Sequence, residues 1–162
     1  MIHKLLVALD DSERADGIFQ CAVDLANSQG ASLHLLHAVV VPVEFPPAAH
    51  ISYADELRPY LLTRADAQLR GFAGRAPHLH IDVIVREATQ PWRAIIDVAA
   101  EIGADLIVVG SHGYHGMDYL LGTNAGKVAN LARCNVLVVH RPPDPQVDSY
   151  RRSAMPDGAQ RG

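Results

Sequence analysis

Hydrophobic residues along the chain follow two patterns, short apolar runs and longer stretches with helical spacing. Apolar runs of four or five residues are typical of strands that are covered on both faces, and alternation of apolar and polar residues indicates a half-covered strand. These two patterns predict five strands, at residues 5–9, 32–41, 79–85, 105–109 and 135–140. The segments between them are long enough to hold one helix each.

Apolar residues in these intervening segments recur at i, i+3, i+4 and i+7, which predicts four amphipathic helices. The first helix is expected to be capped by Ser12 and to end at Gly30. A loop at residues 42–51, rich in proline, precedes a second helix over about 54–71, with Pro59 in its first turn. The expected buried positions of the first helix are Ile18, Cys21, Ala22, Leu25 and Ala26.

Two further helices complete the pattern. The third is expected to be capped by Thr89, to carry Pro91 in its first turn and to end at Gly103. The fourth begins after Gly122. The expected inner faces of these two helices are Trp92, Ile95, Ile96, Ala99 and Ala100, and Ala125, Val128, Ala129 and Ala132.

Strict alternation of strands and helices predicts an α/β fold, a parallel sheet with helices on both faces. In such sheets a ligand binds outside the carboxyl ends of the strands, where the strand order reverses. Two segments carry suitable chemistry for that place. They are the end of the first strand, at residues 8–10, and the loop after the fourth strand, at residues 110–124.

Composition narrows the class of protein. The chain has 162 residues, of which 49% are hydrophobic and 20% charged, as expected for one soluble globular domain. A net charge of −4 argues against binding nucleic acid by bulk charge. Cys21 and Cys134 have no metal-binding spacing and indicate a reducing compartment. No signal-like segment and no apolar run near 18 residues is seen, so we expect a cytoplasmic protein without membrane insertion.

The end of the chain differs from the rest in composition. Residues 1–141 form the predicted domain. Residues 142–162 contain prolines and arginines without apolar periodicity, which predicts a flexible C-terminal tail.

The strongest chemical signal lies after the fourth strand. Its apolar run ends at Gly110, Gly113 and Gly122 follow, and Thr123 and Asn124 open a helix. Glycine allows close approach of a ligand to the backbone, and free N–H groups at a helix start attract anions. The pattern is therefore that of a phosphate-binding loop, although the glycines could equally make a turn and Thr123 could be a helix cap.

Asp10 suggests a different role at the end of the first strand. A carboxylate there can accept hydrogen bonds from ribose hydroxyls or hold Mg²⁺ through water. Capping of the first helix is the alternative for this residue.

Other familiar motifs are absent or incomplete. Residues 122–127 are one residue too short for a P-loop, and no G-x-G-x-x-G follows the first strand. The nine histidines show no recognised metal spacing. Ser111 beside His112 lacks the G-x-S-x-G frame, so it fits a phosphate-contacting loop better than a nucleophile pair, and the sequence identifies no Ser/His/Asp set.

Residues 3–140 as a whole resemble the universal stress protein family. The resemblance is carried by five blocks, of which the last two are the most specific: residues 6–12 (LVALDDS), 35–39 (LLHAV), 104–113 (ADLIVVGSHG), 120–125 (LLGTNA) and 134–139 (CNVLVV). The loop between Gly113 and Gly122 has eight residues, one fewer than the family's nucleotide motif usually has.

The resemblance implies a five-stranded parallel sheet in the order 3-2-1-4-5, as in the adenine nucleotide α-hydrolase-like fold. It also implies ATP, or AMP or ADP, bound between strands 1 and 4, with Mg²⁺ near Asp10. By position, Ala8 and Asp10 would line the adenosine and the Ala38 backbone would read the adenine edge. The residues that would hold ribose and phosphates are Gly110, Ser111, His112, Gly113, Gly122, Thr123 and Asn124.

The same resemblance implies a homodimer formed through the strand at residues 136–139. It leaves three functional hypotheses open. The first is a dimeric, ATP-binding sensor or signalling module of the stress response. The others are a slow ATPase or autophosphorylating protein that uses Ser111 or Thr123, and a nucleotide-free dimeric interaction module.

Overall fold

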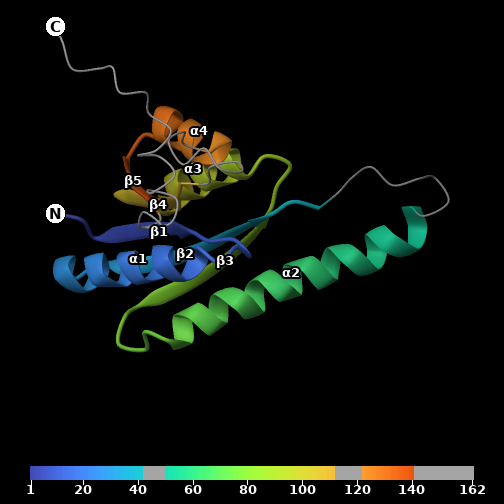
Figure 1. Cartoon of the computed structure of the whole chain (residues 1–162), viewed down its shortest axis with the longest axis horizontal. Coiled ribbons are helices and arrows are strands. Elements are labelled where there is room, and N and C mark those ends of the chain that lie inside the picture. Colours follow the sequence, from blue (N-terminus) through green and yellow to red (C-terminus); the bar gives the residue numbers. More distant parts are fainter. Residues whose placement is uncertain (42–49, 112–121, 141–162) are drawn as a thin grey trace, which may run out of the picture.

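The computed structural model of the chain describes residues 1–41, 50–111 and 122–140, with side chains described from residue 56 onward in the second range. Within these ranges, five parallel strands form one sheet in the order β3-β2-β1-β4-β5 (Figure 1). The strands are β1 (Lys4–Ala8), β2 (Ser32–Val39), β3 (Ile81–Glu87), β4 (Leu106–Gly110) and β5 (Asn135–Val139). This confirms the predicted α/β fold and its strand order.

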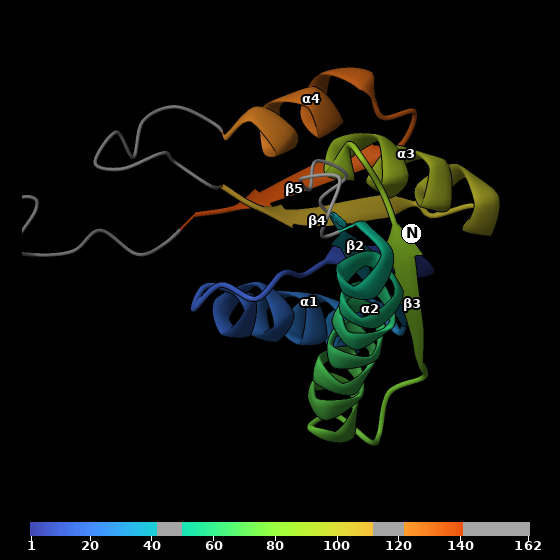
Figure 2. The ribbon, with the colours of Figure 1, turned by 90° about the vertical axis from the view of Figure 1, so that its right-hand side faces the viewer.

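In the described part of the chain, four helices cover the two faces of the sheet: α1 (Ala15–Gln29), α2 (His50–Gly74), α3 (Pro91–Ile102) and α4 (Thr123–Leu131). Figure 2 shows α1 and α2 on one side of the sheet and α3 and α4 on the other. Each crossover returns to a parallel strand, so the chain must alternate between strand and helix. Reversal of the strand order at β1 sends the later helices to the opposite face.

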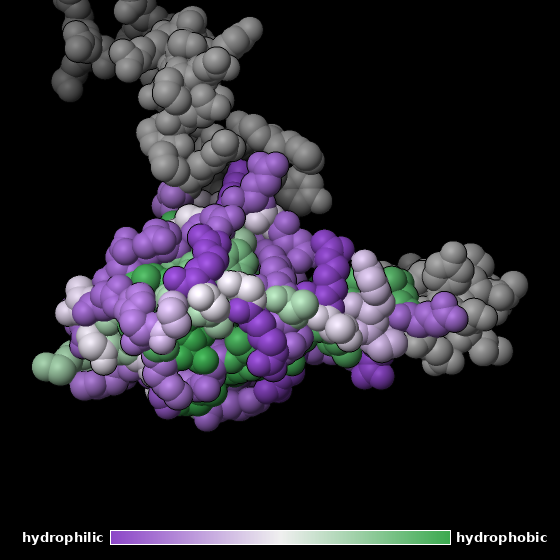
Figure 3. All heavy atoms as spheres, turned by 90° about the horizontal axis from the view of Figure 1, so that it is seen from below, coloured by the Kyte–Doolittle hydropathy of each residue, from purple (hydrophilic) through white to green (hydrophobic). Residues whose placement is uncertain are grey.

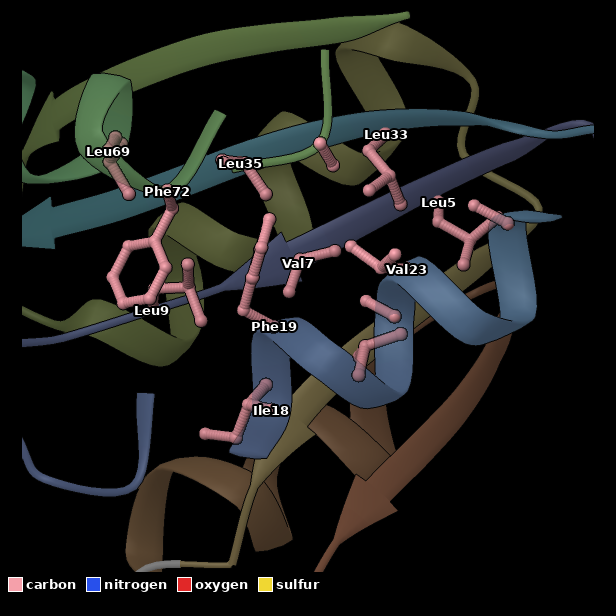
Figure 4. Close-up of a cluster of buried hydrophobic side chains, with 14 of the residues drawn as sticks. Leu5, Val7, Leu9, Ile18, Phe19, Val23, Leu33, Leu35, Leu69 and Phe72 are labelled. Atoms are coloured by element: carbon pink, nitrogen blue, oxygen red, sulfur yellow. The ribbon is translucent and has the colours of Figure 1, made fainter. Parts of the chain in front are cut away.

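The face toward α1 and α2 holds the larger hydrophobic core (Figure 4). Leu5, Val7, Leu33 and Leu35 of β1 and β2 pack against side chains of the two helices. Phe19 of α1 and Phe72 of α2 meet with ring centroids 5.1 Å apart, and the guanidinium of Arg75 lies over both rings. Successive strand residues point to opposite faces, so Leu6, Leu36 and Ile107 belong to the second core, against α3 and α4.

Several expectations about helix ends and faces were wrong. Ser12 and Thr89 are not the helix caps, because α1 has Arg14 and α3 has Gln90 at that position. Pro59 lies well inside α2, since the helix already begins at His50. Pro59 therefore lies beyond the first turn, at a position where the backbone N–H normally donates a hydrogen bond within the helix, and proline has no N–H to donate.

The buried face of α1 is rotated from the predicted one. Phe19 and Val23 are buried, whereas Cys21 and Leu25 are half-buried. In α3 and α4 the outer predicted positions Ala100 and Ala129 are exposed. Alanine at these two positions made the predicted apolar faces of α3 and α4 wider than the faces that pack on the sheet.

Figure 3 shows a face on which hydrophilic side chains predominate and hydrophobic ones form small patches between them. Within the described ranges, no helix combines the length and the apolar character needed to cross a membrane. The predicted tail, residues 142–162, lies outside the described part of the chain.

Candidate functional site

A pocket of about 500 Å³ opens at the carboxyl ends of β1, β2 and β4, beside the start of α4. This is the place where the strand order reverses, because β1 pairs with β2 on one side and with β4 on the other. Parallel sheets bind ligands at such points. The pocket is lined by Ala8, Leu9, Asp10, Asp11, Ser12, His37, Ala38, Val40, Pro91, Ile95, Val109, Gly110, Asn124 and Ala125.

Of the eight predicted binding residues that the structure describes, five line this pocket, namely Ala8, Asp10, Ala38, Gly110 and Asn124. Segments that are far apart in the sequence therefore meet as the strand order requires. Gly122 is the residue that precedes α4 and Thr123 is its first residue, so both stand next to the pocket wall formed by Asn124. His112 and Gly113 lie outside the described residues.

Ser111 directly follows β4, and its backbone is held from two sides. Its N–H donates to the carbonyl of Val139 at 2.9 Å, and its carbonyl accepts from the Arg14 guanidinium at 2.8 Å. Arg14 thereby ties the start of α1 to the end of β4. A second hollow of about 440 Å³ adjoins this contact and includes Arg14, Ser12 and His140.

The Asp10 carboxylate is part of a tight turn at the end of β1. It accepts from the backbone N–H of Ser12 at 3.1 Å, and the Ser12 hydroxyl in turn accepts from the N–H of Arg14 at 3.4 Å. Because α1 begins only at Ala15, Asp10 is not its cap. The turn fixes one carboxylate oxygen and leaves Asp10 as part of the pocket lining.

Gln68 of α2 is a residue of this region that sequence reasoning missed. Its side-chain amide donates from Nε2 to the carbonyl of Asp10 at 2.8 Å, and its Oε1 lies 3.1 Å from Nδ1 of His37. A carbonyl can only accept, so the first contact fixes the orientation of the amide. The Gln68 oxygen can then only accept from His37, so His37 carries a proton on Nδ1. Through these two hydrogen bonds, α2 holds the ends of both β1 and β2 at the pocket.

Charges around the pocket are of both signs. Asp11 forms an ion pair with Arg64 of α2 at 3.1 Å, which offsets one of the two adjacent carboxylates. The N-terminus of α4 adds the positive end of a helix dipole. On α4, Lys127 lies over the Trp92 ring of α3, with 5.0 Å between Nζ and the ring centroid. The pocket thus presents a carboxylate on the β1 side and a positive helix end on the β4 side.

Within the described ranges, no group of three or more His, Cys, Asp or Glu side chains is arranged to hold a metal ion. Asp10 alone could hold Mg²⁺ only together with other oxygen ligands, such as water and the phosphates of a nucleotide.

The fold and the position of the pocket define a class, the doubly wound α/β proteins with a cleft at the switch point between strands 1 and 4. Residues 1–140 match the universal stress protein family. The universal stress protein YxiE of Bacillus subtilis is 32% identical over 147 residues, which cover 86% of this chain and 99% of that protein. The chain therefore belongs to the universal stress protein family.

Solved structures agree with this assignment. The universal stress protein UspA from Lactobacillus plantarum superimposes with a TM-score of 0.74 at 25% identity, covering 85% of this chain and 97% of that one. A universal stress protein solved in complex with cAMP has a TM-score of 0.64 at 22% identity, covering 87% of this chain and 99% of that one.

Proposed function

We propose that the pocket binds an adenine nucleotide, ATP with Mg²⁺ being the form expected, and that the chain acts as a cytoplasmic, dimeric sensor or signalling module of the stress response. The observation that carries the proposal is the 500 Å³ pocket at the strand-order switch, which joins Asp10 to the start of α4. Pockets for small ligands and cofactors usually measure about 300–1,000 Å³ and have mainly apolar walls with few polar groups.

The lining suits the parts of a nucleotide. Ala8, Ala38, Val40, Pro91 and Ile95 offer apolar surface for a flat base. The Asp10 carboxylate can accept hydrogen bonds from ribose hydroxyls, and water bound to Mg²⁺ can bridge to it. Adenine is favoured among the bases because a solved member of the family carries cAMP.

The phosphates are expected on the α4 side of the pocket. Gly122, Thr123 and Asn124 stand at the start of that helix, where backbone N–H groups have no partner within the helix. We expect Ser111, which directly follows β4, to contribute its hydroxyl to the same phosphates. His112 and Gly113 keep the role that the family resemblance implies for them, as contacts of the ribose and the α- and β-phosphates.

A titration of ATP by calorimetry tests the proposal through Asp10→Asn. Asparagine keeps an oxygen that can accept from the Ser12 N–H, so the turn survives while the charge is removed. We expect affinity to fall about 10-fold or more, since a hydrogen bond to a charged group contributes about 1.5–3 kcal/mol. Asp24→Asn on the exposed side of α1 is the matched control and should bind like the wild type. Equal binding by both variants would refute the role of Asp10.

Dimer formation is proposed through β5. This strand is at the edge of the sheet and its four valine and leucine residues, 136–139, are half-buried in the described chain. An apolar edge strand favours pairing with another strand, and a lysine on it disfavours pairing. Sedimentation equilibrium should give a dimer for the wild type and a monomer for Leu137→Lys. Leu131→Lys, at an exposed position on α4, should remain a dimer.

A further inference from the structure

Three polar side chains form a chain of contacts at the amino-terminal edge of the sheet, opposite the nucleotide pocket. Ser32 and His34 are two residues apart in β2 and therefore project from the same face. Asp82 of β3 is the register partner of His34, and Lys4 of β1 is the register partner of Ser32. The pairing of the three strands thus places a hydroxyl, an imidazole, a carboxylate and an ammonium on neighbouring positions.

The contacts run in the order hydroxyl, imidazole, carboxylate. Nδ1 of His34 lies 3.2 Å from Oδ2 of Asp82, and Nε2 lies 3.4 Å from Oγ of Ser32. A carboxylate can only accept, so the neutral ring carries its proton on Nδ1 and has its lone pair on Nε2. The Ser32 hydroxyl has one proton and two acceptors within reach, this nitrogen and the carbonyl of His3 at 3.3 Å.

The surroundings of His34 favour the neutral form of its ring. The residue is 8% exposed, and burial lowers its pKa below the ordinary value of 6.5. Asp82 acts in the opposite direction, while electrostatic interactions with Lys4 and His80 lower the pKa further. His80 also approaches the same Asp82 oxygen, with 3.5 Å between Nε2 and Oδ2. A neutral imidazole with its lone pair toward a hydroxyl is the form that a general base requires.

We propose that Ser32 is a nucleophile activated by His34, which Asp82 orients, and that it accepts an acyl group from activated esters. The Ser32 Oγ would form a bond to the ester carbonyl carbon as its proton passes to Nε2 of His34. The bond from that carbon to the leaving alkoxide oxygen then breaks, and the leaving group takes the proton from the imidazolium. The product is an ester on Ser32 and the free alcohol.

Two features separate this arrangement from the usual polar contacts of a strand end. The hydroxyl, base and orienting carboxylate are connected in the order that nucleophilic catalysis uses on unrelated folds. Lys4, the register partner of Ser32, adds a positive charge on the neighbouring strand, and such a charge can stabilise negative charge that develops on an ester oxygen. Its ammonium has three donors, and one of them bonds to the Ile102 carbonyl at 2.7 Å.

The test uses p-nitrophenyl acetate on the full chain, with release of p-nitrophenolate followed by absorbance and the acetylated residue located by peptide mass spectrometry. We expect one acetyl group on Ser32 of the wild-type chain. In the Ser32→Ala variant, the peptide that contains residue 32 should carry no acetyl group. His34→Gln should acetylate about 10²–10⁴-fold more slowly, which is the usual contribution of a general base. The wild-type rate should rise with pH, with the midpoint of the rise below pH 6.5, because the pKa of His34 is lowered.

Controls keep the test independent of folding. Ser28→Ala removes an exposed serine whose hydroxyl contacts the Leu25 carbonyl, and it should react like the wild type. Asp82→Asn changes a half-exposed residue, so it should stay folded by circular dichroism and still react more slowly and with an altered pH profile. Acetylation of Ser32 at the same rate in wild type and in folded Asp82→Asn and His34→Gln would overturn the proposal, as would acetylation of other serines alone.

Discussion

Replacing Gln68 by methionine removes the two hydrogen bonds that this side chain of α2 makes to Asp10 and His37 at the pocket, and it nearly conserves side-chain volume. The two bonds join the Gln68 amide to the Asp10 carbonyl at 2.8 Å and to His37 at 3.1 Å. Each such bond contributes about 0.5–1.5 kcal/mol, so we expect the free energy of unfolding to fall by about 1–3 kcal/mol. Urea unfolding followed by circular dichroism measures this change.

The same substitution should also weaken nucleotide binding. Asp10 and His37 both line the pocket, and Gln68 holds them in place before the nucleotide binds. Without Gln68, the nucleotide must order these two residues itself, which lowers the free energy gained on binding. A loss of about 1.4 kcal/mol corresponds to a tenfold weaker affinity, which calorimetry resolves. The Gln68→Glu variant should lose more unfolding free energy than Gln68→Met. A glutamate oxygen would then face the backbone carbonyl oxygen of Asp10, and both oxygens can only accept a hydrogen bond.

Gln20→Met is the matched control on α1, where the glutamine amide bonds to the exposed Asp24. Its unfolding free energy should stay within about 0.5 kcal/mol of the wild type. If Gln68→Met matched this control in both stability and nucleotide affinity, the inference that α2 supports the pocket would be refuted.

Three further predictions concern the fold. Phe19→Ala should cost about 3–5 kcal/mol in urea unfolding, since the ring is 2% exposed, and a loss no larger than that of the exposed Tyr60→Ala would contradict the packing. Gly103→Ala should cost about 1–2 kcal/mol because φ is 63° there; an unchanged unfolding midpoint would exclude this left-handed cap. Backbone N–H groups of His3 and Lys4 lower the pKa of Asp105 below the ordinary 3.8, so its stabilisation is present above that pH and lost as pH falls through the lowered pKa. The Asp105→Asn variant should not show this loss of stability when it is unfolded by acid. An acid unfolding profile identical to that of the wild type would contradict the stabilising role of Asp105.

Much of the architecture was predictable because both faces of the central strands are covered. The runs at β1 and β4 are continuously apolar, and a covered parallel strand requires this pattern. Helix ends were less predictable. At Ser12 and Asp10 the local hydrogen bonds form a turn before α1, which from the sequence looks the same as a cap.

The candidate site likewise contains some residues that the sequence could place and others that it could not. Asp10, Gly110 and Asn124 could be placed together because the carboxyl ends of adjacent parallel strands and the following helix start share one edge of the sheet. Gln68 could not be found, since its role depends on how α2 crosses the sheet. The Ser32–His34–Asp82 contacts depend on the register between β2 and β3, which periodicity does not determine.

A crystal structure of the chain grown with saturating ATP and Mg²⁺ tests the nucleotide proposal most directly. We expect density for adenine against Ala38 and Ile95, for ribose beside the Asp10 carboxylate, and for phosphates at the start of α4. An empty pocket under these conditions, or nucleotide bound elsewhere on the chain, would contradict the proposed function.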